Sequence, residues 1–151
     1  MVQKSADSLS TLYEADETAW LDAMAELIRA GRLDEIDYPH LAEYLEDMAK
    51  RDRREVKSCL RTLLANLLTW TYQPELHTNG LCGTIITQQE DLEDNLFTSG
   101  TLRNHAEAKL SDAYREAAEI AVAETGLPAA TFPAECPWTL EQLLSAEVLG
   151  E

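Results

Sequence analysis

The stretch EYLEDMAKRDRREVKSCLRTLLANLL, residues 43–68, contains the change of pattern that decides the fold. Nine of its first fourteen residues are charged, whereas five of its last ten are leucine. Its apolar residues recur every three or four positions, which is the period of one helical face. Neither proline nor glycine occurs between Pro39 and Pro74, so we predict one helix of about 35 residues that begins after Asp37.

The apolar seam of this long helix changes width along its length. Beyond Leu60 the apolar arc widens to include Leu64 and Leu68, so we expect the second half to be buried from two sides. The first half has a narrow stripe and is expected to be buried from one side. The predicted seam comprises Leu41, Leu45, Met48, Val56, Cys59, Leu63, Leu67 and Trp70.

The rest of the chain also follows the helical period. We predict helices over Thr11–Ala30, Leu81–Thr98 and Leu102–Thr125, the first and last of them capped by Gly31 and Gly126. After a proline-containing tail, Thr139 and Gln142 form a capping-box pattern for a last short helix. The inward face of the first helix is expected to carry Tyr13, Trp20, Met24, Leu27 and Ile28.

These elements predict an all-α, up-down helical bundle with one long central helix and an irregular, proline-containing C-terminal tail that ends in a short helix. At 151 residues the chain has the length of one domain, so residues 1–151 are expected to form a single domain. No apolar run approaches the length of a membrane span, and the first ten residues have no apolar signal segment. The three cysteines form no CxxC pair, which favours reduced thiols and a cytoplasmic location.

The charge of the chain restricts its partners. The formal net charge is −16, which disfavours nucleic acid and favours a protein partner with a basic or mixed-charge surface, or self-association. Residues 51–75 form the only basic segment, with 5 basic and 3 acidic residues. Residues 1–50 carry 4 basic and 12 acidic residues, a net charge of −8.

Strong catalytic motifs are absent from the sequence. It contains no P-loop, no glycine-rich dinucleotide motif, no HExxH, no GxSxG and no zinc pattern. We therefore predict no cofactor and no metal, and assign no catalytic residue.

Acidic residues on or beside the apolar seams are the remaining candidates for a site. Asp52 lies at the centre of the long helix's stripe, Glu17 lies between Tyr13 and Trp20, and Glu124 lies on a last helical turn. A buried carboxylate needs a partner or a shifted pKa. The acids can mark a solvated or salt-bridged helix surface, a pocket for a cation or substrate, or a docking face. The candidate binding residues are Glu46, Asp47, Asp52, Glu55 and Glu124.

Six segments along the chain form an ordered set. They are LYEADETAW (12–20), GRLDEID (31–37), LAEYLEDM (41–48), LLTWTYQPE (67–75), ETGL (124–127) and FPAECPWTLEQLL (132–144). This set resembles a bacterial, largely cyanobacterial family, the domain of unknown function 29. The resemblance covers nearly the whole chain and implies an all-helical fold, but it implies no activity, substrate or cofactor.

The chain departs from the family pattern at several polar positions. The pattern has Phe at Glu17, His at Asn66, Trp at Leu81, and Glu-Gln-Arg where this chain has Thr87-Gln88-Gln89. The five candidate acids match the pattern. If the family builds a site on that His and Arg, this chain lacks part of it, which favours a binding role over catalysis. The leading prediction is thus a non-enzymatic protein-interaction module, and the alternative is a divalent-metal-dependent hydrolase of nucleotides or phosphate esters.

Overall fold

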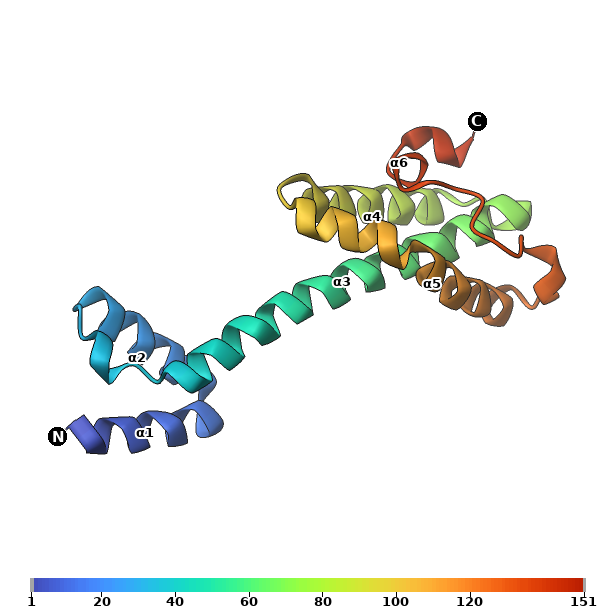
Figure 1. Ribbon diagram of the computed structural model, residues 1–151. Coiled ribbons are helices and arrows are strands. Elements are labelled where there is room, and N and C mark those ends of the chain that lie inside the picture. Colours follow the sequence, from blue (N-terminus) through green and yellow to red (C-terminus); the bar gives the residue numbers. More distant parts are fainter. Residues whose placement is uncertain (1, 151) are drawn as a thin grey trace. The chain divides into compact units, whose positions relative to one another are not determined.

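A computed structural model describes the backbone of residues 2–150 and the side chains of residues 8–150. Within that range the chain forms six α-helices and no β-strand (Figure 1). The predicted all-α class is therefore confirmed. No helix among the described residues combines the length and the apolarity that crossing a membrane requires.

The chain divides into two compact units, Met1–Lys50 and Arg51–Glu151, called here the N-terminal and C-terminal units. Each has its own cluster of buried apolar residues. The helix α3, Tyr38–Tyr72, contributes residues to both units. A single domain over residues 1–151 stays a prediction, because two such clusters can unfold together or separately.

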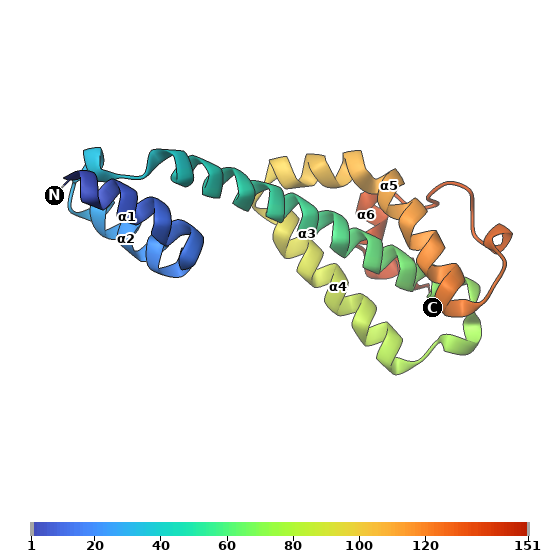
Figure 2. The ribbon, with the colours of Figure 1, turned by 90° about the horizontal axis from the view of Figure 1, so that it is seen from below.

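The N-terminal unit begins with two helices where one was predicted. α1 spans Val2–Ala15 and α2 spans Glu17–Arg29, and the two lie side by side in both ribbon views (Figures 1 and 2). The prediction of one helix over Thr11–Ala30 is wrong, because Asp16 leaves the helical conformation. Its carboxylate accepts a hydrogen bond from the amide of Ala19 at 3.1 Å and so caps α2.

The core of the N-terminal unit is built around Trp20, whose side chain is fully buried. The indole Nε1 of Trp20 donates a hydrogen bond to Asp37 Oδ2 at 3.2 Å. The same oxygen lies 2.7 Å from His40 Nδ1, and the His40 ring stacks on Tyr13 with centroids 4.2 Å apart. One carboxylate thus links α2 to the first turn of α3. Gly31 has the predicted left-handed conformation after α2, with φ of +73°.

The long helix α3 has the predicted length of 35 residues and ends before Gln73 and Pro74. Its burial changes along the chain. Val56 and Leu60 are buried, and so are Leu63, Leu64, Leu67 and Leu68, as the widening apolar arc predicted. Leu45, which lies on the same predicted stripe, is exposed. The spacing of apolar residues therefore predicts which residues share a face of α3, but not how much of that face other elements bury.

The C-terminal unit is the predicted up-down arrangement. The second half of α3 is followed by α4, Asn79–Phe97, and by α5, Gly100–Thr125 (Figure 2). The Asn66 side chain donates a hydrogen bond from α3 to Gln88 on α4, at 3.0 Å. Gly126 caps α5 in the left-handed region, as predicted. The small seam of α5 is fully buried at Ala106, Ala113, Ala117 and Ala121.

The C-terminal tail packs back on this unit, as expected. Phe132 is buried and meets the Tyr72 ring edge-on, with centroids 5.6 Å apart. The short helix α6, Leu140–Leu143, carries the predicted capping box. The buried amide of Gln89 on α4 donates hydrogen bonds to the carbonyls of Leu143 and Ser145, at 2.7 and 3.1 Å. Gln89 therefore holds the tail through the carbonyl of Leu143 at the end of α6 and the carbonyl of Ser145, which also accepts a hydrogen bond from the Val148 amide at 3.2 Å.

Candidate functional site

The five acidic residues predicted as a binding set all have exposed side chains. Glu46 and Asp47 belong to the N-terminal unit, and Asp52, Glu55 and Glu124 belong to the C-terminal unit. Among residues 8–150, no three His, Cys, Asp or Glu side chains are placed so that they could hold a metal ion together. The acids are thus surface residues of their units, and their role as a joint site stays a prediction.

Two acids expected on inward faces lie instead on the surface. The helix is interrupted at Asp16, so Glu17 is the first residue of α2 and does not continue the helical face that carries Tyr13. The Glu17 side chain is therefore exposed. Asp52 is exposed although it continues the stripe of Leu45 and Met48. A position on an apolar stripe requires burial only where another element covers that stripe.

We expect the substitution Asp52→Asn to change the free energy of unfolding by less than about 0.5 kcal/mol, as is usual for exposed positions. Urea unfolding followed by circular dichroism measures this change. The same titration with Mn²⁺ tests the hydrolase alternative. A Mn²⁺-dependent stabilisation of the wild type that is lost in Asp52→Asn would contradict a surface role and support a cation site.

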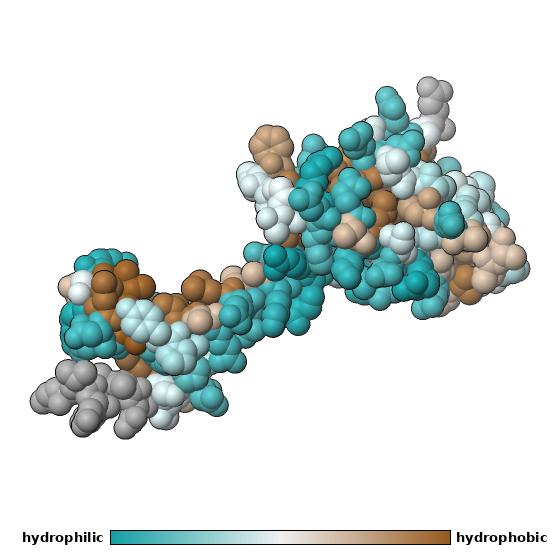
Figure 3. All heavy atoms as spheres, viewed as in Figure 1, coloured by the Kyte–Doolittle hydropathy of each residue, from teal (hydrophilic) through white to brown (hydrophobic). Residues whose placement is uncertain are grey.

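Large apolar side chains are exposed on the N-terminal unit within one segment of 18 residues. Ile28 is 51% exposed, Leu33 52%, Tyr38 54% and Leu45 59%. We call these four residues the apolar face. Figure 3 shows hydrophobic side chains gathered over α2 and the beginning of α3. Soluble proteins rarely leave such clusters uncovered unless they serve an interaction.

Local structure positions each member of the apolar face. Ile28 lies in the last turn of α2, Leu33 begins the 3₁₀ turn Leu33–Glu35, and Tyr38 begins α3. The Tyr38 hydroxyl donates a hydrogen bond to the Leu33 carbonyl at 2.7 Å. This bond holds the connection between the two helices against the start of α3.

The prediction that Ile28 and Leu45 face a core is wrong, because both side chains are more than half exposed. Among residues 8–50, whose side chains the structure describes, the core of the N-terminal unit buries only Leu9, Trp20, Met24 and Ile36. A unit of about 50 residues has too little interior to bury every apolar side chain of its helices. Their exposure could have been suspected from the small size of this unit, but not from the spacing of the apolar residues.

The surroundings of the apolar face are acidic. Burial raises the pKa of the Tyr13 phenol, and the carboxylates of Glu43, Asp47, Glu17 and Glu14 raise it further. These acids act in the same direction because each opposes a second negative charge. The potential around the N-terminal unit is therefore negative, in keeping with its net charge of −8 over residues 1–50.

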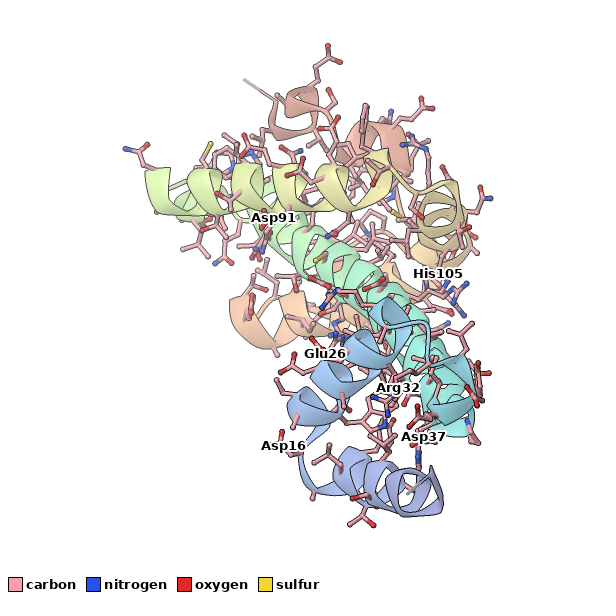
Figure 4. The ribbon with its side chains drawn as sticks, turned by 90° about the vertical axis from the view of Figure 1, so that its left-hand side faces the viewer. Asp16, Glu26, Arg32, Asp37, Asp91 and His105 are labelled. Carbon is pink, nitrogen blue, oxygen red and sulfur yellow. The ribbon has the colours of Figure 1, made fainter. Side chains whose placement is uncertain are left out.

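Ion pairs hold the turn within this surface. The Arg32 guanidinium contacts both carboxylate oxygens of Glu35, and this hydrogen bonding lowers the pKa of Glu35. Arg29 pairs with Glu26 at 3.4 Å. Figure 4 shows Glu26, Arg32 and Asp37 on the N-terminal unit, with Asp16 at the corner between α1 and α2. Both arginines have carboxylate partners, so they neutralise little of the remaining acidic charge.

Two cysteines of the C-terminal unit, Cys59 and Cys136, lie in surroundings that disfavour the thiolate form. Burial raises the pKa of Cys59, and the carboxylates of Glu55 and Asp91 raise it further. Burial also raises the pKa of Cys136. Both groups are therefore thiols at neutral pH, whereas nucleophilic attack requires the thiolate. Cys59, which was predicted on the apolar seam of the long helix, is partly buried and packs against the core of the C-terminal unit.

An apolar cavity of about 610 Å³ lies beside α5 in the C-terminal unit. Its lining combines residues 114–122 of α5 with residues 129–134 of the tail. The Tyr114 hydroxyl at its wall donates to the Pro133 carbonyl at 2.6 Å, and burial raises the pKa of Tyr114 to about 12. Among the described residues, only Arg115 and Glu119 are charged and line this cavity, and both are exposed. The cavity offers space but no group poised for proton transfer.

Comparisons with known proteins give one match. The family model described as "Domain of unknown function DUF29" matches residues 12–149. No curated protein and no solved structure matches the chain. The match confirms the resemblance seen in the sequence over nearly the whole chain.

Proposed function

This chain belongs to the family described as domain of unknown function DUF29, and we propose that it serves in the bacterial cytoplasm as a non-enzymatic protein-interaction module. The apolar face of the N-terminal unit binds a cationic amphipathic helix of a partner protein. The observation that carries this proposal is the exposure of four large apolar side chains, Ile28, Leu33, Tyr38 and Leu45, each more than half accessible to solvent.

Burial of these side chains supplies a driving force for binding. Complete burial of one large apolar side chain contributes about 1.5–3 kcal/mol. Since each of the four is already partly covered, the gain for each is a fraction of that range. Several such contributions together offset the loss of translational and rotational freedom on association. An apolar helix face is the partner surface that matches a short apolar strip on helices.

Charge complementarity selects a basic partner. The net charge of −8 over residues 1–50 attracts a cationic helix and accelerates its association, and this effect weakens as salt increases. Two copies of the chain would instead bring two charges of −16 together. The same acidic charge that favours a basic helix therefore opposes self-association.

We expect the wild-type protein to bind a synthetic leucine/lysine amphipathic helix, and Leu45→Ala to raise its Kd about tenfold, which corresponds to about 1.4 kcal/mol. Fluorescence anisotropy of the labelled peptide measures Kd. The matched control is Leu76→Ala, which truncates a leucine that is 39% exposed on the C-terminal unit. Binding should weaken with added salt and vanish for a peptide in which glutamate replaces lysine.

The proposal fails if wild-type protein does not bind this peptide, or if Leu45→Ala and Leu76→Ala weaken binding equally. Equal weakening would indicate diffuse attraction between an acidic protein and a basic peptide. Sedimentation of the protein alone tests self-association, which would replace the proposal if Leu45→Ala dissociated an oligomer. The hydrolase stays a prediction, tested by the Mn²⁺ titration of Asp52→Asn.

A further inference from the structure

In the C-terminal unit, basic residues of α5 lie beside the basic segment of α3. Arg53, Lys57 and Arg61 follow one another at intervals of four on α3, so they lie on one helix face. His105 and Lys109 repeat the same interval on α5. We call four of these residues the basic cluster: Arg53, Lys57, His105 and Lys109.

Ion pairs establish that the two basic faces meet. Glu116 on α5 lies 3.3 Å from Lys57 Nζ and 3.6 Å from Arg61 Nη1. His105 on α5 forms a hydrogen bond with the Arg53 backbone, whereas Glu116, later on α5, pairs with Lys57 and Arg61, later on α3. Residue numbers on the two helices therefore rise together, so α3 and α5 run parallel. The parallel direction places the earlier residues of α5, His105 and Lys109, beside the earlier part of this face of α3.

The pKa of His105 is lowered by its surroundings. Burial lowers the pKa of its imidazole, and the positive charges of Lys109, Arg53 and Lys57 lower it further, whereas a hydrogen bond to the Arg53 backbone opposes them. All four side chains are half-buried. His105 lies on α5 in Figure 4. At neutral pH the ring is therefore uncharged, with three cations within electrostatic reach.

The positive charge of this cluster is not balanced within the described residues. Glu116 is shared between Lys57 and Arg61, so one carboxylate meets two cations. Among residues 8–150, neither Arg53 nor Lys109 forms an ion pair with a carboxylate. Half-buried cations without a counter-charge are unusual in a chain whose net charge is −16.

We infer that Arg53, Lys57, His105 and Lys109 form a binding site for a small, doubly charged oxyanion, such as inorganic phosphate or a small phosphomonoester. Two negative charges match the excess of the cluster better than one carboxylate does. Phosphate oxygens accept charge-assisted hydrogen bonds from arginine and lysine. An extended polyanion such as nucleic acid would also meet the acidic surface, so a compact anion is favoured. This site is independent of the apolar face.

The test uses the three histidines of the chain, His40, His77 and His105, as probes in one NMR experiment. Sulfate serves as a dianion whose charge is constant between pH 5 and 8, with sodium chloride of equal ionic strength as reference. A bound dianion stabilises the imidazolium form. We expect sulfate to raise the titration midpoint of His105 by at least about 0.5 pH unit, while His40 and His77 stay unchanged.

Two matched variants then locate the site. Lys109→Gln should abolish the sulfate effect on His105, whereas Arg115→Gln, which removes one charge elsewhere on α5, should preserve it. Inorganic phosphate and glycerol phosphate, each titrated into wild type and Lys109→Gln, distinguish the free anion from a phosphomonoester as the preferred ligand. Unchanged unfolding midpoints for both variants show that the fold is intact.

Equal shifts of all three histidines would overturn the inference, because they would reflect ionic conditions and not a site. Loss of the effect in Arg115→Gln as well as Lys109→Gln would do so too. So would a His105 midpoint that sulfate leaves in place. None of these outcomes affects the proposal for the apolar face, which depends on Leu45 and on the N-terminal unit.

Discussion

Trp20→Ala is expected to destabilise the N-terminal unit by about 3–5 kcal/mol, the range for truncating a buried aromatic side chain. Trp20 is fully buried, and it is one of only four buried core residues among residues 8–50 of its unit. The substitution also removes the indole N–H that Asp37 accepts at 3.2 Å. Hydrogen exchange measured by mass spectrometry over residues 8–50 reports the loss of protection, and urea unfolding gives the free energy.

The variant Trp20→Phe separates the two causes, because it keeps an aromatic ring and removes the N–H donor. We expect it to cost about 1.5–3 kcal/mol, the range for a lost hydrogen bond to a charged group, since the Asp37 carboxylate keeps its contact with His40 Nδ1. A cost below about 1 kcal/mol for Trp20→Ala would contradict the central place of Trp20. That result would mean that α1 and α2 are held together by other contacts.

Leu63→Ala is expected to lower the free energy of unfolding of the C-terminal unit by about 2–5 kcal/mol. The Leu63 side chain is fully buried on the part of α3 that is covered from two sides. Removing its terminal carbons leaves a cavity that the neighbouring leucines and α5 alanines fill only in part. Urea unfolding followed by far-ultraviolet circular dichroism measures this change.

The control is Leu45→Ala, on the same predicted stripe of the same helix. Since Leu45 is 59% exposed, its truncation should change stability by less than about 0.5 kcal/mol. Its effect should appear instead in peptide binding. Comparable losses of stability from the two substitutions would show that Leu45 is buried in solution, and would remove one member of the apolar face.

Local interactions account for the elements that were predicted correctly. The end of α2 at Gly31 and the end of α5 at Gly126 follow from left-handed glycine conformations. Thr139 and Gln142 make the reciprocal hydrogen bonds of a capping box. These features depend on residues within about one turn of each other, so the amino-acid order suffices to place them.

The break at Asp16 is also local, yet it was missed. A continuous helix and a capped second helix differ only in whether the Asp16 carboxylate bonds to the Ala19 amide. Both conformations satisfy the apolar period on each side of the residue. Packing of α2 against α1 selects the break, because a hairpin of two helices buries Trp20 and one straight helix of that length does not.

The candidate site, too, could be predicted from the sequence only in part. The acids Asp52 and Glu124 could be found in the sequence, but their exposure could not, because period identifies a shared face without saying what covers it. The basic cluster could be found only in half. Arg53 and Lys57 are close in sequence, whereas His105 and Lys109 join them through the parallel packing of α3 and α5.

The amino-acid sequence by itself determined the helical class, the length of α3 and the different apolar widths of its two halves. It also determined the glycine caps after α2 and α5 and the capping box of α6. Only the tertiary structure decided which apolar residues stay exposed, how Gln89 holds the tail, and which cations meet on adjacent helices. The physical reason is the distance along the chain over which each interaction acts. Hydrogen bonds and backbone preferences act within a helical turn, whereas burial and charge clustering depend on which distant segments pack together.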